Sequence, residues 1–366
     1  NTFCTDNNSP LKNTTHRKTT TSSKKNMKKL FILLFLCNLT FLCSAHEGEN
    51  FVASDMLASM KPGDKAALLM VHFGTTHDDT RALTIDAINA KAREAFPDLE
   101  MREAFTSRII IRRLKARGIE KLTPLDAMLR LRSEGYTHVI VQSSNIIDGV
   151  EMESLRRDME SVQPFFKEIR IGTPLLYSVE DTEKVVEILN NRLTNTQNQK
   201  ASAKKGEHFV LVGHGTYTPS TAIYSQMDYM LKANGLSNFH VGTIEGYPSF
   251  ETMLAQLKAG KAKQVTLVPF MFVAGDHAKN DIAEDWKEAL EKEGYTVNVR
   301  MEGLGQVPEI QEIFINHIRF MLKCLAESTA PVRNMKQYLL AALYNAPTTM
   351  QLYYQNQTNH DLSNRG

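Results

Sequence analysis

Cysteine is scarce in this chain of 366 residues, and its four copies are unevenly placed. Cys4, Cys37 and Cys43 lie within the first 45 residues, which leaves Cys324 as the one thiol of the remainder. A single thiol cannot form an internal bridge, so a disulfide scaffold is excluded after residue 45. The sequence also contains no CxxC pair, no GxxxxGKS/T phosphate loop and no GxSxG nucleophile elbow. Nothing in it therefore indicates a dithiol redox site, P-loop ATP hydrolysis or an α/β-hydrolase.

The first residues cannot form a core. Residues 1–26 are rich in Ser, Thr, Asn and Lys and almost lack large apolar side chains. They are followed by 27-MKKLFILLFLCNLTFLCSA-45, which has two lysines, a short apolar run and small residues at its end. This order is typical of a secretory signal peptide, and the apolar run is too short for a confident membrane span. We therefore expect translation to start at Met27, residues 1–26 to be misread upstream sequence, and the mature protein to be periplasmic. The alternatives are a cytosolic extension before a membrane anchor, or a lipoprotein signal at Cys43, which Leu42 disfavours.

Charge gives no reason to expect a nucleic-acid partner. Residues 1–45 hold seven of the 43 Lys and Arg residues and one of the 41 Asp and Glu residues. The remainder then has 36 basic and 40 acidic residues, a net charge of −4. The sequence pI of about 8.2 mostly describes the leader.

From Lys65 onward, short apolar runs alternate with amphipathic segments. Predicted strands are 66–74, 137–145, 169–177, 208–215, 239–246, 265–275 and 295–303. Predicted helices are 78–96, 150–162, 219–234, 249–260, 279–293 and 307–327. Strands that are apolar on both faces and alternate with helices predict parallel, helix-covered sheets of an α/β protein.

The two halves of this pattern look alike. The segment 71-VHFGT-75 resembles 212-VGHGT-216, and 139-VIVQSSNIIDGVE-151 resembles 265-VTLVPFMFVAGDH-277. A polar stretch, 193-LTNTQNQKASAKKGE-207, separates them. We expect an N-terminal lobe over 46–195, a C-terminal lobe over 207–330, a central cleft, and a tail over 331–366. Ligands of such sheets bind beyond the carboxyl ends of the strands.

Three polar side chains stand at such ends in the second half. His214 lies between Gly213 and Gly215, Glu245 precedes Gly246, and His277 follows 265-VTLVPFMFVAGD-276. Two imidazoles and a carboxylate suit a borderline divalent metal such as Co²⁺, Ni²⁺, Fe²⁺ or Zn²⁺. They equally suit proton transfer, because histidine titrates near neutral pH.

Other polar residues have simpler explanations. His72 lies one place earlier than His214 in the matching segment, so we expect it to point elsewhere. Asp276 either orients His277 or caps the following helix. Arg112 and Arg113 are expected on a solvated helix face. Arg108 is placed to bind an anionic ligand.

At these segments the chain resembles the anaerobic sirohydrochlorin cobaltochelatases, which are class II chelatases related to ferrochelatase. The resemblance runs through nearly all of residues 65–325, and 244-IEGYPSFETMLAQLKAGKAKQVTLVPFMFVAGDHAKNDIAEDWK-287 is its most specific part. It implies two Rossmann-like lobes with a tetrapyrrole in the cleft. It also implies metal-site roles for His214, Glu245 and His277, with His214 receiving the pyrrole protons.

The resemblance implies ATP-independent insertion of a divalent metal, Co²⁺ first and Fe²⁺ or Ni²⁺ next, into sirohydrochlorin. Arg108 and Asn145 are the predicted ligand contacts, and a homo-oligomer is compatible with the sequence. Asn145 also marks a departure, because 143-SSNIIDG-149 has Ser-Asn where the family leads us to expect a pair such as Thr-His. A second departure is that Tyr217-Thr218 follows the Gly-His-Gly strand, with no further histidine.

The expected signal peptide also distinguishes this chain from the cytosolic members of the family. A role in haem or metal handling is therefore an alternative to a role in vitamin B12 synthesis. The alternatives are a non-catalytic periplasmic tetrapyrrole- or metal-binding protein, an enzyme that removes iron from haem, and a two-lobed solute-binding protein.

Overall fold

The computed structural model describes residues 55–194, 206–276 and 278–323. The predicted signal peptide at 27–45, most of the polar stretch between the halves, His277 and the tail lie outside these residues. Within them, no helix is both long enough and apolar enough to cross a membrane.

The first sheet has four parallel strands in the order β2-β1-β3-β4. They are β1 (Ala66–His72), β2 (Glu100–Phe105), β3 (His138–Ser143) and β4 (Glu168–Ile171). Alternate residues of β1 enter different cores: Leu69 packs with α5 and α6 residues, and Leu68 packs with α3 residues. The strand is therefore buried on both faces, which explains its unbroken apolar run.

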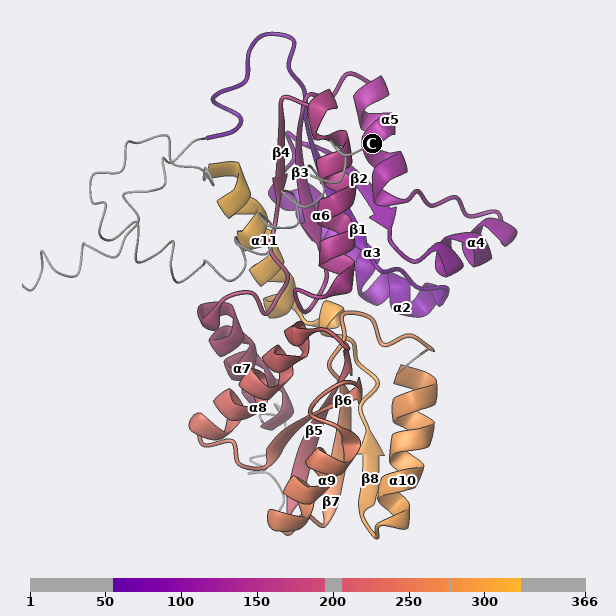
Figure 1. Cartoon of the computed structure of the whole chain (residues 1–366), viewed down its shortest axis with the longest axis vertical. Coiled ribbons are helices and arrows are strands. Elements are labelled where there is room, and N and C mark those ends of the chain that lie inside the picture. Colours follow the sequence, from indigo (N-terminus) through magenta and orange to yellow (C-terminus); the bar gives the residue numbers. More distant parts are fainter. Residues whose placement is uncertain (1–54, 195–205, 277, 324–366) are drawn as a thin grey trace, which may run out of the picture. The chain divides into compact units, whose positions relative to one another are not determined.

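The second sheet repeats this topology, with the order β6-β5-β7-β8 and all strands parallel. Its strands are β5 (Glu207–Gly215), β6 (Phe239–Glu245), β7 (Gln264–Pro269) and β8 (Thr296–Val299). Each sheet thus places its first strand between its second and third (Figure 1). The predicted α/β class with parallel sheets is confirmed.

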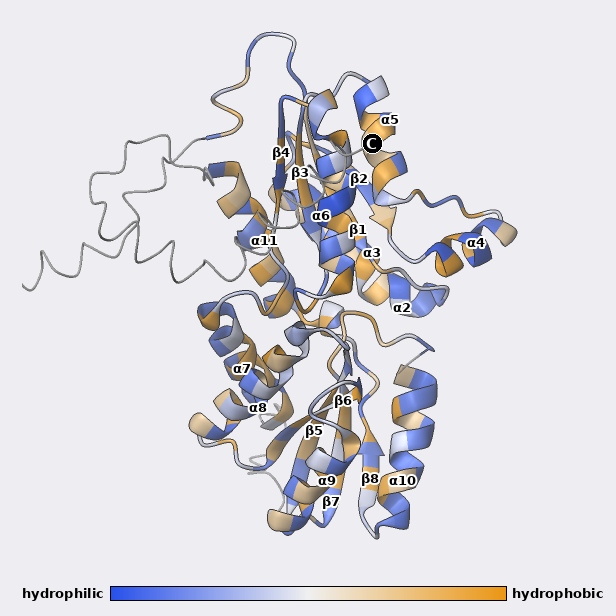
Figure 2. Ribbon diagram, in the orientation of Figure 1, coloured by the Kyte–Doolittle hydropathy of each residue, from blue (hydrophilic) through white to orange (hydrophobic). Residues whose placement is uncertain are grey.

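The helices separate the strands along the chain, and Figure 2 shows that they carry both hydrophilic and hydrophobic residues. Those of the first half are α2 (Asp78–Leu83), α3 (Ile85–Ala95), α4 (Arg108–Ala116), α5 (Pro124–Ser133), α6 (Val150–Val162), η2 (Gln163–Phe165) and α7 (Val179–Thr194). Those of the second half are η3 (Pro219–Thr221), α8 (Ala222–Ala233), α9 (Phe250–Ala259), the π-helix η4 (Ala278–Trp286), α10 (Lys287–Lys292), η5 (Leu304–Gln306) and α11 (Pro308–Lys323).

Several boundaries differ from the sequence-based expectations. The predicted helix 78–96 is two helices, α2 and α3, that meet at Thr84. The predicted strand 265–275 ends at Pro269, since proline has no N–H for the ladder. Strand β2 was not predicted, because its charged sequence EMREAF belongs to a half-buried edge strand.

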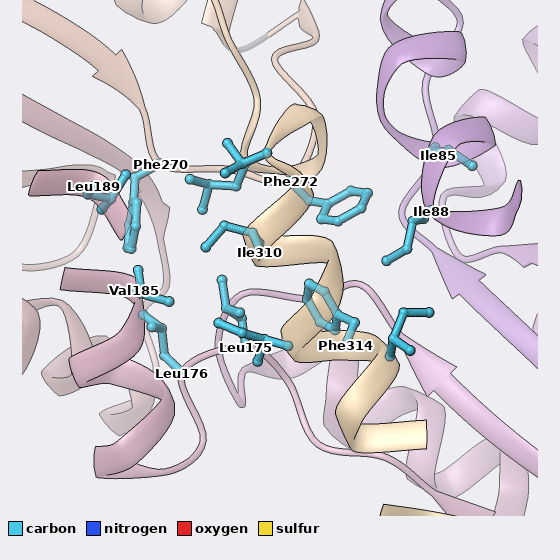
Figure 3. Close-up of a cluster of buried hydrophobic side chains, with 14 of the residues drawn as sticks. Ile85, Ile88, Leu175, Leu176, Val185, Leu189, Phe270, Phe272, Ile310 and Phe314 are labelled. Carbon is cyan, nitrogen blue, oxygen red and sulfur yellow. The ribbon is translucent and has the colours of Figure 1, made fainter. Parts of the chain in front are cut away.

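Helices α7 and α11 each pack away from the strands that they follow. Helix α7 contacts α8 of the second half, and α11 contacts α3 and β3 of the first. Figure 3 shows Ile310 and Phe314 of α11 in a cluster that also contains Phe272 and Ile88. This one cluster includes core residues of both sheets, such as Leu68 and Leu211. The lobe boundaries at 195 and 207 stay predictions.

Candidate active site

A cavity of about 560 Å³ lies at the carboxyl ends of strands from both sheets. That volume is within the ordinary range for small-molecule sites. The segments that follow four strands contribute to its lining: Phe73–Thr76, Ser144–Ile147, Thr216–Tyr217 and Phe270–Val273. The position of the cavity agrees with the expectation that a ligand site forms at the carboxyl ends of the strands.

His214 and Glu245 both line this cavity. His214 is the next-to-last residue of β5, half-buried, with Nδ1 3.3 Å from the carbonyl oxygen of Gly215. Glu245 is the last residue of β6 and is exposed. The structure therefore brings two of the three predicted metal-site residues to one cavity.

Glycine makes this arrangement sterically possible. Gly215 pairs with Glu245 in the β5–β6 register and has a φ of 85°, a conformation that other residues rarely adopt. A Cβ at Gly215 would lie 1.5 Å from the carbonyl oxygen of Glu245. Gly246 has a φ of 94°, and a Cβ there would lie 2.5 Å from the carbonyl oxygen of Thr216. The glycines after His214 and Glu245 thus allow the two strand ends to approach closely.

The third predicted ligand, His277, lies outside the described residues. Among the residues that are described, no group of three His, Cys, Asp or Glu side chains is arranged to hold a metal ion. The metal-site roles of His214, Glu245 and His277 stay predictions.

Asp276, whose role was left open, binds residues of the first half. Its Oδ1 lies 2.6 Å from Nε2 of His77, and its Oδ2 lies 3.4 Å from Nη1 of Arg113. The hydrogen bond with His77 and the nearby charges of Arg113 and Lys279 lower the pKa of Asp276. Asp276 and Arg113 both line the cavity, so this ion pair lies at its edge.

Sequence reasoning assigned no role to His77 and expected Arg113 on a solvated helix face. His77 follows Gly74 at the carboxyl end of β1, so the rule that selected His277 would also have selected it. Arg113 is the sixth residue of α4 and follows the end of β2 by eight positions, and no sequence signal marked it.

The two predicted ligand contacts differ in position. Asn145 lines the cavity; its N–H donates to Oγ of Ser143, and its carbonyl accepts from the N–H of Leu175. Arg108 is exposed at the first position of α4 and, among the described residues, is not part of the cavity lining. Ligand binding by either residue stays a prediction.

Much of the remaining surface of the cavity is apolar and open to solvent. Phe73, Ile109 and Tyr217 line it with 47%, 55% and 85% of their surface exposed. Buried Phe270 and Phe272 also contribute to the lining. Exposed apolar side chains around a cavity indicate a ligand with a large apolar surface.

Comparisons with known proteins point to one family. The sequence profile of the cobalt chelatase (CbiK) family matches residues 66–323. A sirohydrochlorin cobaltochelatase of Salmonella typhimurium is 35% identical over 271 residues, which are 73% of this chain and 100% of that protein. The sirohydrochlorin cobaltochelatase CbiKC of Nitratidesulfovibrio vulgaris is 31% identical over 270 residues, 72% of this chain and 93% of that protein. The profile of a family of unknown function (DUF6017) matches residues 310–365.

Among solved structures, SirB from Bacillus subtilis with Fe³⁺ has a similar fold. The TM-score is 0.51 and the sequence identity is 15%, over 70% of this chain and 96% of SirB. At this identity the likeness concerns the fold alone.

Proposed function

Because this chain belongs to the cobalt chelatase (CbiK) family, we propose that it is a metal chelatase that inserts Co²⁺ into sirohydrochlorin without ATP. The observation that carries the proposal is the cavity at the carboxyl ends of both sheets, where His214 and Glu245 meet a largely apolar lining. A flat macrocycle needs apolar contact area, and the metal and the leaving protons need polar groups beside it.

Insertion of a divalent metal displaces two pyrrole N–H protons. We assign the acceptance of a pyrrole proton to His214, because an imidazole is a base near neutral pH. Glu245 supplies an exposed carboxylate at the adjacent strand end and, with His277, would deliver the metal. Co²⁺ is the substrate metal that the family favours, and imidazole and carboxylate donors would also accept Fe²⁺ or Ni²⁺.

The cavity edge also offers a cationic side chain for the carboxylates of the ligand. Sirohydrochlorin carries carboxylates, and Arg113 at the cavity edge is a guanidinium that could bind one bidentately. Its contact with Asp276 is long, at 3.4 Å, so a ligand carboxylate would compete with it.

The proposal is tested by mixing the purified protein with sirohydrochlorin and Co²⁺, Fe²⁺ or Ni²⁺ and following the absorption spectrum of the macrocycle. The wild-type protein should accelerate insertion of Co²⁺, and His214→Ala should lower kcat by about 100-fold or more. His317→Ala is the matched control, because His317 is a half-buried histidine on α11 that binds Asp181. Stoichiometric binding without turnover by the wild type would contradict a chelatase and favour a binding protein. Equal rates for His214→Ala and wild type would contradict the assigned role.

We also propose that the protein is exported and acts in the periplasm, on the basis of the signal-peptide pattern at 27–45. Expression of the full chain should yield a mature protein that begins after Ala45 and is released by osmotic shock. Recovery of an uncleaved protein with the cytoplasmic fraction would contradict export.

A further inference from the structure

A buried histidine behind the cavity has no part in the function proposed above. His72 is the last residue of β1 and is 1% exposed. Its Nδ1 lies 2.8 Å from Oγ of Ser144, and its Nε2 lies 3.0 Å from Oδ1 of Asn89. Both ring nitrogens thus have a partner.

The hydrogen-bond partners determine which nitrogen carries the proton. Nδ2 of Asn89 donates to Oε2 of Glu103 at 2.6 Å, and Glu103 also pairs with Lys121. A carboxylate only accepts, so the amide group of Asn89 must face Glu103 and its carbonyl oxygen must face His72. Nε2 of His72 therefore carries the hydrogen and donates it to Asn89. Nδ1 presents its lone pair, and the hydroxyl of Ser144 donates to it.

This orientation connects the imidazole with the cavity. Ser144 is among the residues that line the cavity, whereas His72 is not. The ring of Phe272 stacks on that of His72 at 6.1 Å between centroids, and Phe105 meets it edge-on at 6.4 Å. Phe272 itself lines the cavity, so an aromatic ring shields the imidazole and the Ser144 hydroxyl provides the polar connection.

The surroundings of His72 favour its uncharged form. Burial lowers its pKa, and the charge of Lys121 lowers it further. Glu103, the hydrogen bond with Asn89 and Asp86 act in the opposite direction. The carboxylate of Glu103 lies one amide group away, where it would stabilise a transient imidazolium.

We propose that Ser144, backed by His72, accepts the second pyrrole proton during metal insertion; this inference rests on the chelatase function proposed above. In the step, a pyrrole N–H bond breaks and its proton bonds to Oγ of Ser144. The original Ser144 O–H bond breaks at the same time, and that proton bonds to Nδ1 of His72. The pyrrole nitrogen keeps the electron pair, which then bonds to the metal. With His214 taking the first proton, the charges of M²⁺ and the doubly deprotonated ring balance, and His72 later returns its proton through Ser144 to water.

The alternative is a structural role, in which the hydrogen bonds of His72 and Ser144 only hold β1, β3 and α3 together. A structural role affects folding and binding, whereas a proton-transfer role affects kcat and its pH dependence. Ser144→Ala removes the proposed acceptor, Ser144→Thr keeps a hydroxyl, and His72→Asn removes the base. His240→Asn is the matched control for His72→Asn, because His240 is 2% exposed, hydrogen-bonded at both ring nitrogens and absent from the described cavity lining.

The experiment measures kcat and KM for Co²⁺ insertion into sirohydrochlorin between pH 5.5 and 9, together with thermal unfolding of each variant. We expect Ser144→Ala and His72→Asn each to lower kcat by about 100-fold with KM for sirohydrochlorin nearly unchanged. The double variant should lose no more than either single variant, because the two groups act as a unit. Ser144→Thr should recover most of the rate, and His240→Asn should keep the wild-type kcat and pH profile.

A Ser144→Ala variant that keeps the wild-type kcat and pH profile would overturn the relay while leaving the chelatase function intact. A wild-type protein that inserts no metal would instead overturn the proposed function. If His72→Asn does not fold, Ser144→Ala and Ser144→Thr still decide, since they change only the side chain of one residue that lines the cavity.

Discussion

The close approach of β5 and β6 at Gly215 makes a quantitative prediction. Replacing Gly215 by alanine places a Cβ 1.5 Å from the carbonyl oxygen of Glu245, where ordinary contacts are 3.4 Å or more. The oxygen belongs to the backbone, so no side-chain rotation can relieve the overlap, and the strand ends must separate by about 2 Å. Overpacking of this kind costs about 1–3 kcal/mol, and alanine at a φ of 85° costs about 1–2 kcal/mol more.

Gly235→Ala is the control that separates these two costs. Gly235 has a φ of 79°, and a Cβ there would meet nothing within 4 Å. It should therefore lose only the conformational part, about 1–2 kcal/mol of unfolding free energy. Gly215→Ala should lose about 2–5 kcal/mol in urea denaturation and, because His214 and Glu245 are displaced by more than 1 Å, about 100-fold in insertion rate. Equal stability of the two variants, with an unchanged rate for Gly215→Ala, would refute the described approach of the strand ends.

Three further outcomes are expected. Burial lowers the pKa of His240 to about 4, so the folded protein binds fewer protons than the unfolded chain, and stability should fall as pH drops from 6.5 toward 4. Urea midpoints at pH 7.5 and 5 should show this loss in the wild type and a smaller one in His240→Asn. Phe314→Ala should lower the unfolding free energy by about 3–5 kcal/mol in urea denaturation, because Phe314 is fully buried and packs edge-on against Phe272 at 5.7 Å; a loss below about 1 kcal/mol would contradict this packing. Asp276→Asn should change stability by less than about 1 kcal/mol, since the side chain is 55% exposed, and a larger loss would mean that its contacts with His77 and Arg113 are stronger than surface ion pairs.

Much of the fold follows from local sequence pattern. Apolar runs flanked by amphipathic segments gave the parallel sheets, and the helix predicted at 150–162 has those bounds in the structure. The edge strand β2 could not be predicted in this way, because three of its six residues are charged and only Ala104 and Phe105 are buried. Phe270 and Phe272 were misassigned to a strand, since an apolar residue that lines a cavity has the same sequence signature as one that fills a core.

Only those residues of the candidate site that a local sequence signal marks could be predicted. His214 and Glu245 stand at strand ends next to glycines, a signal that is readable along the chain. The partnership of His72 with Ser144 is not readable, because the two residues are 72 positions apart and meet only when β1 pairs with β3. His72 was expected to point elsewhere, and it does not line the cavity, yet its hydrogen bond reaches a residue that does.

One cavity is proposed to present His214 and Glu245 to a flat tetrapyrrole. A crystal structure of the protein with sirohydrochlorin and Co²⁺ bound would show whether it does. We expect the macrocycle to lie against Phe73 and Phe272, with the metal beside His214 and Glu245 and a pyrrole nitrogen within reach of the Ser144 hydroxyl. A macrocycle bound elsewhere on the protein, or a metal far from both His214 and Glu245, would contradict it.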